Sequence, residues 1–169
     1  MYKFYNVATL KNELKSYNAL KKELNCMISA YNDPLNEIKC RYVFLDEKLK
    51  QIKSPGKSDG LGGFIEESDV KFNDLIIKKK NVENELKEYI QKNKKEFIEN
   101  CSVLQARIST IEYYIEQISN EKDKEFIKDF YIDLSKKEVL DKYDIYNLNS
   151  LYRKADIILK KIIKKVNHV

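Results

Sequence analysis

Side chains that can form paired hydrogen bonds with nucleotide bases lie one helical turn apart near the C-terminus. Asn149 and Arg153 have this spacing, and an Asn side chain can pair with adenine while an Arg side chain can pair with guanine. Lysine side chains and helix N-termini suit phosphate oxygens. These residue types predict a surface for double-stranded DNA. Its candidate contact residues are Ser135, Lys136, Lys137, Asn147, Asn149, Ser150, Tyr152, Arg153, Lys154 and Lys160.

A short helix, a tight turn and a longer helix are expected to position these side chains. Ser135 and Glu138 have the S-x-x-E spacing of a capping box, in which each side chain bonds the backbone N–H of the other residue. The turn falls at residues 144–147, where Ile145 is an apolar plug and Asn147 can cap the second helix. A second helix held across a first is a helix-turn-helix, whose outer face enters the major groove. At three-four spacing the second helix is expected to bury Leu148, Leu151, Ala155, Ile158 and Ile162.

The face opposite this stripe is polar and mostly basic. At about 100° per residue it carries Asn149, Arg153, Asp156, Lys160 and Lys164. From Arg153 onward six Lys or Arg residues accompany one acidic residue, Asp156. That carboxylate could accept a hydrogen bond from a cytosine amine, or it could merely oppose Lys160. The alternative to a DNA-binding face is a structural three-helix unit whose polar face is only solvated.

The segments FIKDFYIDLSKKEVLDKYDI and SLYRKADIILKKI resemble the last DNA-binding region of bacterial sigma factors. They are most similar to the phage-encoded transcription regulators of the ArpU and RinA type, which carry that fold without the rest of a sigma factor. The resemblance also includes an N-terminal helical half interrupted by a loop with Ser-Pro and Gly-Gly pairs. The matching residues are Phe130, Tyr131, Ser135, Glu138, Ile145, Leu151, Tyr152 and Arg153, with Ser54, Pro55, Gly62 and Gly63 upstream.

The resemblance implies late-gene control by a phage or prophage regulator, with a possible contact to RNA polymerase. Two features depart from the pattern. The turn is one residue longer than usual, and Asp144 stands where Gly is common. Base-contact positions are therefore carried over only for Arg153 and its neighbours.

Two long apolar seams with four-three spacing precede this region, at residues 10–52 and 72–118. Such seams predict long helices near 8–53 and 67–119 that pair as an antiparallel hairpin. Pairing of each seam with another chain is the alternative. In either arrangement, seams of this length favour a homodimer over a monomer.

Three local features modify these two helices. Asp33 and Pro34 suit an N-cap and a first helical position, so a break or kink is expected near Asn32. Lys79 and Asn93 interrupt the second seam and could set its register. All four glycines lie within 54–66, which predicts a loop there, and Ser68 or Asp69 could cap the helix that follows it.

These patterns predict an all-α fold with two domains. Residues 1–120 would form the helical hairpin, with its Gly/Pro loop at 54–66. Residues 121–169 would form a small three-helix domain containing the helix-turn-helix, whose first helix contributes Phe126, Ile127, Phe130 and Tyr131.

Composition narrows the classes of function. The chain has 169 residues, 35% of them charged, and a net charge of +5, which is compatible with a nucleic-acid partner but not diagnostic. MYKFYNVATL lacks the apolar segment of a signal peptide, and no apolar run approaches a membrane span. Three scattered cysteines fit a reducing cytoplasm. The single histidine, His168, and these cysteines are too few and too scattered for a metal site.

No pattern in the sequence resembles a catalytic site or a cofactor site. Gly56-Lys57-Ser58 is similar to the end of a phosphate-binding loop, but Gln51 stands where that motif needs Gly. We therefore expect no enzyme and no cofactor. The leading hypothesis is a sequence-specific transcription regulator that binds DNA. The alternatives are a coiled-coil scaffold or adaptor protein and a small terminase subunit.

Overall fold

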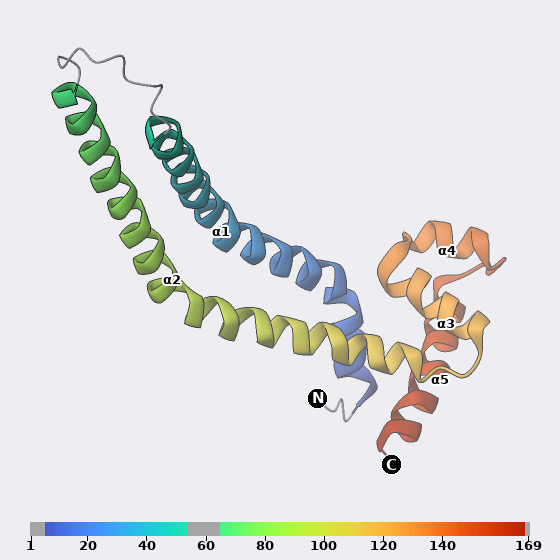
Figure 1. Cartoon of the computed structure of the whole chain (residues 1–169). Helices are drawn as coiled ribbons and strands as arrows, with labels where there is room; N and C mark the ends of the chain where they lie inside the picture. Colours follow the sequence, from blue (N-terminus) through green and yellow to red (C-terminus); the bar gives the residue numbers. More distant parts are fainter. Residues whose placement is uncertain (1–5, 54–64, 168–169) are drawn as a thin grey trace. The chain divides into compact units, whose positions relative to one another are not determined.

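The structure, a computed structural model, describes residues 6–53 and 65–167. For residue 53 and residues 65–70 it describes the backbone but not the side chains. The described residues contain no strand, which confirms the all-α class. The elements, coloured along the chain in Figure 1, are α1 (Val7–Lys53), α2 (Ile65–Glu116), α3 (Glu121–Lys128), the π-helix η1 (Asp129–Asp133), α4 (Lys136–Lys142) and α5 (Leu148–Asn167).

The long helices α1 and α2 pack closely along each other, as predicted for the hairpin (Figure 1). Their contacts run in opposite directions along the two helices. Tyr31 stacks on Phe97 with ring centroids 4.1 Å apart, whereas Asp46, further along α1, pairs with Lys79, which comes earlier in α2. The pairing is therefore antiparallel and within one chain. Helix α2 begins at Ile65, so Ser68 and Asp69 lie inside the helix and not at its N-terminus, where they were expected. Of the loop predicted at 54–66, residues 65 and 66 belong to α2. The other loop residues, 54–64, lie outside the described residues.

The break predicted near Asn32 does not occur, because α1 continues through Pro34 without interruption, whereas the alternative, a kink at this place, stays a prediction. Proline removes one backbone donor and its ring crowds the preceding turn. Packing across the hairpin holds that turn in place. The Tyr89 hydroxyl of α2 donates to the Tyr31 carbonyl at 2.9 Å, and Leu35 is buried beside Pro34. Tertiary contacts therefore outweigh the local preference for a helix start.

The chain divides into two compact units, and both contain parts of α1 and α2. One unit comprises Met1–Cys26 with Asn100–Val169, and the other comprises Met27–Glu99. The domain boundary expected between residues 120 and 121 stays a prediction, and in this division the ends of the long helices share a unit with the C-terminal helices. Whether residues 121–169 fold alone stays a prediction. The large, fully buried side chains of the first unit include Leu10, Leu14, Ile111, Tyr114, Phe126, Ile127, Phe130 and Leu159.

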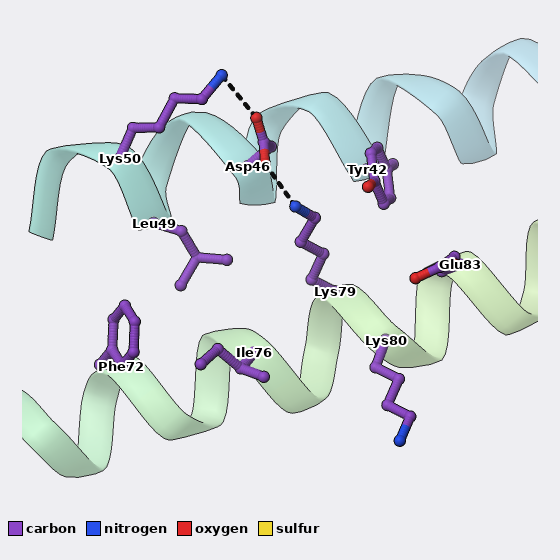
Figure 2. A pocket seen from close by; sticks show the side chains of 9 residues that line it. All are labelled: Tyr42, Asp46, Leu49, Lys50, Phe72, Ile76, Lys79, Lys80 and Glu83. Atoms are coloured by element: carbon purple, nitrogen blue, oxygen red, sulfur yellow. Dashed lines mark hydrogen bonds and ion pairs between the residues drawn. The ribbon is translucent and has the colours of Figure 1, made fainter. Parts of the chain in front are cut away.

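In the second unit, Lys79 interrupts the apolar seam and is paired. Its ammonium donates to the Asp46 carboxylate and lies 4.9 Å from the centre of the Tyr42 ring. Figure 2 shows these residues around a cavity of about 530 Å³, with Lys50 bonded to Asp46 from the next turn of α1. The hydrogen bonds from Lys50 and Lys79 lower the pKa of Asp46 to about 2. Asn93, the other interruption, donates to the Tyr89 carbonyl of its own helix at 2.9 Å.

Candidate nucleic-acid interface

A cluster of aromatic rings joins α3, η1, the residue that caps the C-terminus of α4, and α5. Phe126 and Phe130 stack with centroids 5.7 Å apart. The Tyr143 ring packs edge-on against Phe126 at 5.1 Å, and the Tyr152 ring packs edge-on against Phe130 at 5.2 Å. Edge-to-face and offset stacking of this kind are favourable beyond the area they bury. Because Tyr152 lies in the second turn of α5, the cluster fixes that helix against η1.

The π-helix η1 directs a buried carboxylate toward α4. The Leu134 N–H donates to the Asp129 carbonyl five residues earlier, at 3.1 Å, which is the π-helix pattern. The Asp129 side chain accepts hydrogen bonds from the Lys142 ammonium and the Tyr143 hydroxyl, both at 2.7 Å. Burial alone would raise the pKa of Asp129, but these two bonds hold it below its ordinary value. Burial, together with the same carboxylate, raises the pKa of Tyr143.

The predicted caps of the helix-turn-helix are present. The Ser135 hydroxyl accepts from the Glu138 N–H at 3.4 Å, and the Glu138 carboxylate accepts from the Ser135 N–H at 2.7 Å, which together form a capping box. The Asn147 side chain accepts from the Ser150 N–H at 2.8 Å and so caps α5. Asp144 has a φ of 50°, a left-handed conformation that favours glycine and tolerates aspartate. This explains why a residue other than Gly can occupy the turn.

The buried face of α5 differs in part from the predicted stripe. Leu151, Ala155, Ile158 and Ile162 are buried as expected, but Leu148 is 44% exposed because it lies in the first turn, beyond the packed core. The structure also buries three side chains outside the predicted stripe, namely Leu159, Ile163 and Val166. At about 100° per residue, the burial of these three side chains shifts the centre of the exposed face of α5 away from Asn149 and Asp156. Asn149 itself stays exposed, at the edge of this face. Its exposed members are Ser150, Arg153, Ile157, Lys160, Lys161 and Lys164.

Five of the predicted contact residues have intramolecular partners. Ser135 and Asn147 serve as caps, and Tyr152 packs on Phe130 while remaining partly exposed. Two lysines lie over aromatic rings. The Lys136 ammonium bonds the Phe130 carbonyl and lies 3.5 Å from the centre of its ring, and the Lys154 ammonium lies 4.3 Å from the centre of the Phe126 ring. Burial and the nearby Lys15 lower the pKa of Lys136.

The remaining predicted contact residues are exposed side chains of α4 and α5. They are Lys137, Asn149, Ser150, Arg153 and Lys160. Asn149, Ser150, Arg153 and Lys160 all lie on α5, whereas Lys137 lies in the first turn of α4. The structure thus separates the predicted set into residues that hold the fold together and residues that are available to a partner.

Two contacts from α1 to the C-terminal helices were not predicted from the sequence. The Lys11 ammonium forms an ion pair with the Asp156 carboxylate, so Asp156 faces α1 instead of the centre of the exposed face. The Asn18 side chain donates to the Ile132 carbonyl at 2.7 Å. Both pairs are more than a hundred residues apart in sequence, and no local pattern marks them.

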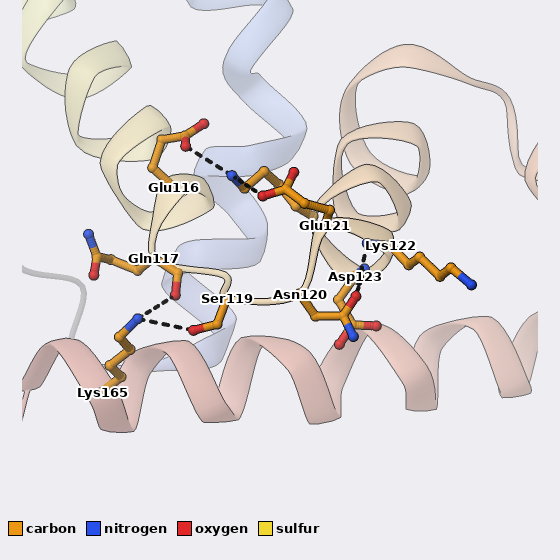
Figure 3. Close-up of polar contacts among 9 residues, drawn as sticks. Glu116, Gln117, Ser119, Asn120, Glu121, Lys122, Asp123 and Lys165 are labelled. Carbon is orange, nitrogen blue, oxygen red and sulfur yellow. Dashed lines mark hydrogen bonds and ion pairs between the residues drawn. The ribbon is translucent and has the colours of Figure 1, made fainter.

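The connection between α2 and α3 is also tied to α5. Figure 3 shows the Lys165 ammonium donating to the Gln117 carbonyl at 2.9 Å and to the Ser119 hydroxyl at 3.3 Å. In the same connection, Asn120 caps α3 by accepting from the N–H groups of Lys122 and Asp123. These contacts hold the C-terminal half of α5 in place, so its position does not depend on the aromatic cluster alone.

The exposed face of α5 offers positive charge and hydrogen-bond donors. Within residues 6–53 and 65–167 no three His, Cys, Asp or Glu side chains are grouped to hold a metal ion. No helix in these ranges is long and apolar enough to cross a bilayer. No protein-family model, curated protein or solved structure matches the chain.

Proposed function

We propose that the chain is a sequence-specific transcription regulator that binds promoter DNA through the exposed face of α5. The observation that carries the proposal is that four cationic side chains on that face lack a partner among the described residues. Among the described residues, Arg153, Lys160, Lys161 and Lys164 have neither a hydrogen-bond partner nor an ion-pair partner within the chain. Phosphate oxygens supply the charge that such a surface lacks, and base edges supply acceptors for arginine.

The cap geometry supports the same proposal. Ser135 and Asn147 cap α4 and α5, and Tyr152 fixes the start of α5 against η1. A helix held in this way presents its first turns with little freedom, which sequence reading in a major groove requires. We extend the proposal to late-gene control in a phage or prophage, in the cytoplasm, with RNA polymerase as a possible second partner.

The test is a binding titration on duplex DNA over a series of salt concentrations. Replacing Lys160, Lys161 and Lys164 with Ala should weaken binding and reduce the slope of log affinity against log salt by about 0.9 for each phosphate that is no longer neutralised. The matched control replaces the exposed lysines Lys92, Lys94 and Lys95 of α2, which changes the net charge by the same amount. Equal effects of the two triple variants would show that charge alone, and not α5, attracts the DNA.

Exposed apolar side chains on the second unit favour a second candidate function, that of a scaffold or adaptor. Phe44 is 55% exposed and Ile77 is 58% exposed. Val43 and Ile76, the residues next to them in sequence, are exposed as well, and exposed apolar patches, unlike single apolar residues, mark protein contacts. The same surface would serve the homodimer that the long seams predict. Light scattering of wild type and a Phe44→Ser, Ile77→Ser variant tests it, because loss of a dimer in the variant identifies the surface.

A further inference from the structure

Ile157 is an apolar side chain in the middle of the cationic face of α5. It is 56% exposed, although every other Ile of α5 is buried. Arg153 lies one turn before it and Lys161 one turn after it, each about 6 Å away along the helix axis. An exposed isoleucine in this position is not explained by the packing of the fold.

The charges around Ile157 are not neutralised within the chain. Arg153, Lys160, Lys161 and Lys164 lack intramolecular partners among the described residues, and the neighbouring carboxylate of Asp156 is engaged by Lys11. Ile157 also lines a shallow depression of about 420 Å³ with Ser150, Arg153, Lys154, Lys161 and Asp123, the last being its one carboxylate. Ile157 is thus an exposed apolar side chain surrounded mostly by cationic side chains.

A partner for such a surface needs negative charge together with a projecting apolar group. The major groove of DNA offers both, because the C5-methyl group of thymine projects between the phosphate strands. An acidic peptide with an apolar side chain is the competing partner. Two features favour DNA: the cations flank Ile157 along the helix axis, as phosphates flank a groove, and the capped helix-turn-helix holds α5 rigidly.

We propose that Ile157 contacts a thymine methyl group, so that the recognised site contains a T·A pair opposite this residue. The inference rests on the proposed DNA binding by α5 and adds a specificity-determining contact to it. Burial of one methyl-sized group corresponds to about a fourfold change in affinity, from about 0.8 kcal/mol per group.

The experiment begins with selection of a preferred duplex from a random pool by the full chain. Each thymine of that duplex is then replaced in turn by deoxyuridine, which removes only the methyl group. Wild type should bind about fourfold more weakly at one or two positions. Ile157→Ala should bind the thymine and uracil duplexes equally at those positions. The control Ile98→Ala, which changes an isoleucine of α2 that is 52% exposed, should keep the wild-type ratio.

The outcomes separate this inference from the proposed function. If selection yields no preferred duplex and no duplex is bound, the DNA proposal fails and the inference fails with it. If a preferred duplex is bound through Arg153 but uracil and Ile157→Ala have no effect, only the thymine contact is overturned. Binding of a synthetic acidic peptide with a central leucine, abolished in Ile157→Ala while duplex binding is retained, would also overturn it.

Discussion

The Lys142 ammonium donates to the Asp129 carboxylate at 2.7 Å and so joins the last turn of α4 to the π-helix η1. The Tyr143 hydroxyl completes the contact at the same distance. Because Asp129 is buried, its charge depends on these two donors. The position of α4 relative to η1, and therefore the geometry of the helix-turn-helix, depends on this carboxylate.

Replacing Asp129 with Ala should lower the free energy of unfolding by about 2–3 kcal/mol, because a hydrogen-bonded charge is removed and the Tyr143 hydroxyl is left without its acceptor. Asp129→Asn should cost less, since its amide oxygen can still accept from Tyr143. Urea denaturation followed by circular dichroism measures both. The control Asp133→Ala removes an exposed carboxylate from the same π-helix. An equal, small effect of Asp129→Ala and Asp133→Ala would contradict the role given to Asp129.

The same contact predicts a pH dependence. The folded-state pKa of Asp129 lies below its ordinary value, so its stabilising contribution is present above about pH 3.9, the unfolded value. It is lost as the pH falls through the folded pKa, because the unfolded state then binds the proton first. The difference in stability between wild type and Asp129→Asn should therefore shrink on acidification. A difference that stays constant from neutral to acidic pH would show that the carboxylate charge contributes nothing.

The turn between α4 and α5 makes a separate prediction. Asp144 has a left-handed backbone, which costs about 1–2 kcal/mol for a residue with a Cβ atom and less for Asp. Asp144→Gly should therefore be neutral or slightly stabilising, whereas Asp144→Val should destabilise by at least about 1 kcal/mol. Thermal unfolding of the two variants measures the difference. If Val is tolerated as well as Gly, this turn does not hold its backbone in the left-handed conformation.

Local features of this fold were predictable from the sequence, because their interactions span only a few residues. The capping box of Ser135 and Glu138 and the cap formed by Asn147 are examples. The direction of the exposed face of α5 was less predictable. It depends on the burial of Leu159 and Ile163, which distant parts of the chain determine.

Long-range contacts account for the other differences between expectation and structure. Lys11 forms an ion pair with Asp156, which is more than a hundred residues away in sequence. Packing between α1 and α2 keeps α1 helical at Pro34. Neither follows from spacing or composition. The predicted DNA-contact residues likewise proved to be of two kinds. Lys136, Lys154 and Lys160 are all lysines of the predicted helix-turn-helix, but Lys136 and Lys154 lie over aromatic rings.

The compact unit formed by both chain ends predicts the behaviour of a fragment. Residues 121–169 share that unit with buried side chains of α1 and α2, including Leu14 and Ile111. The isolated fragment should therefore lack a cooperative unfolding transition, because its apolar surface is no longer covered. Calorimetry and amide-proton dispersion in an NMR spectrum measure this. A dispersed spectrum with a sharp transition would establish residues 121–169 as an independent domain.

The most direct test of DNA recognition by α5 compares Arg153→Ala with wild type on a selected duplex and on random duplexes. We expect about a 5- to 150-fold weaker affinity for the selected duplex, equivalent to about 1–3 kcal/mol, with relaxed preference at one base pair. Lys160→Ala should instead weaken all duplexes alike, and Arg41→Ala on α1 should leave DNA binding unchanged. Unchanged affinity and unchanged preference in both Arg153→Ala and Asn149→Ala would contradict DNA recognition by α5 and favour the adaptor function.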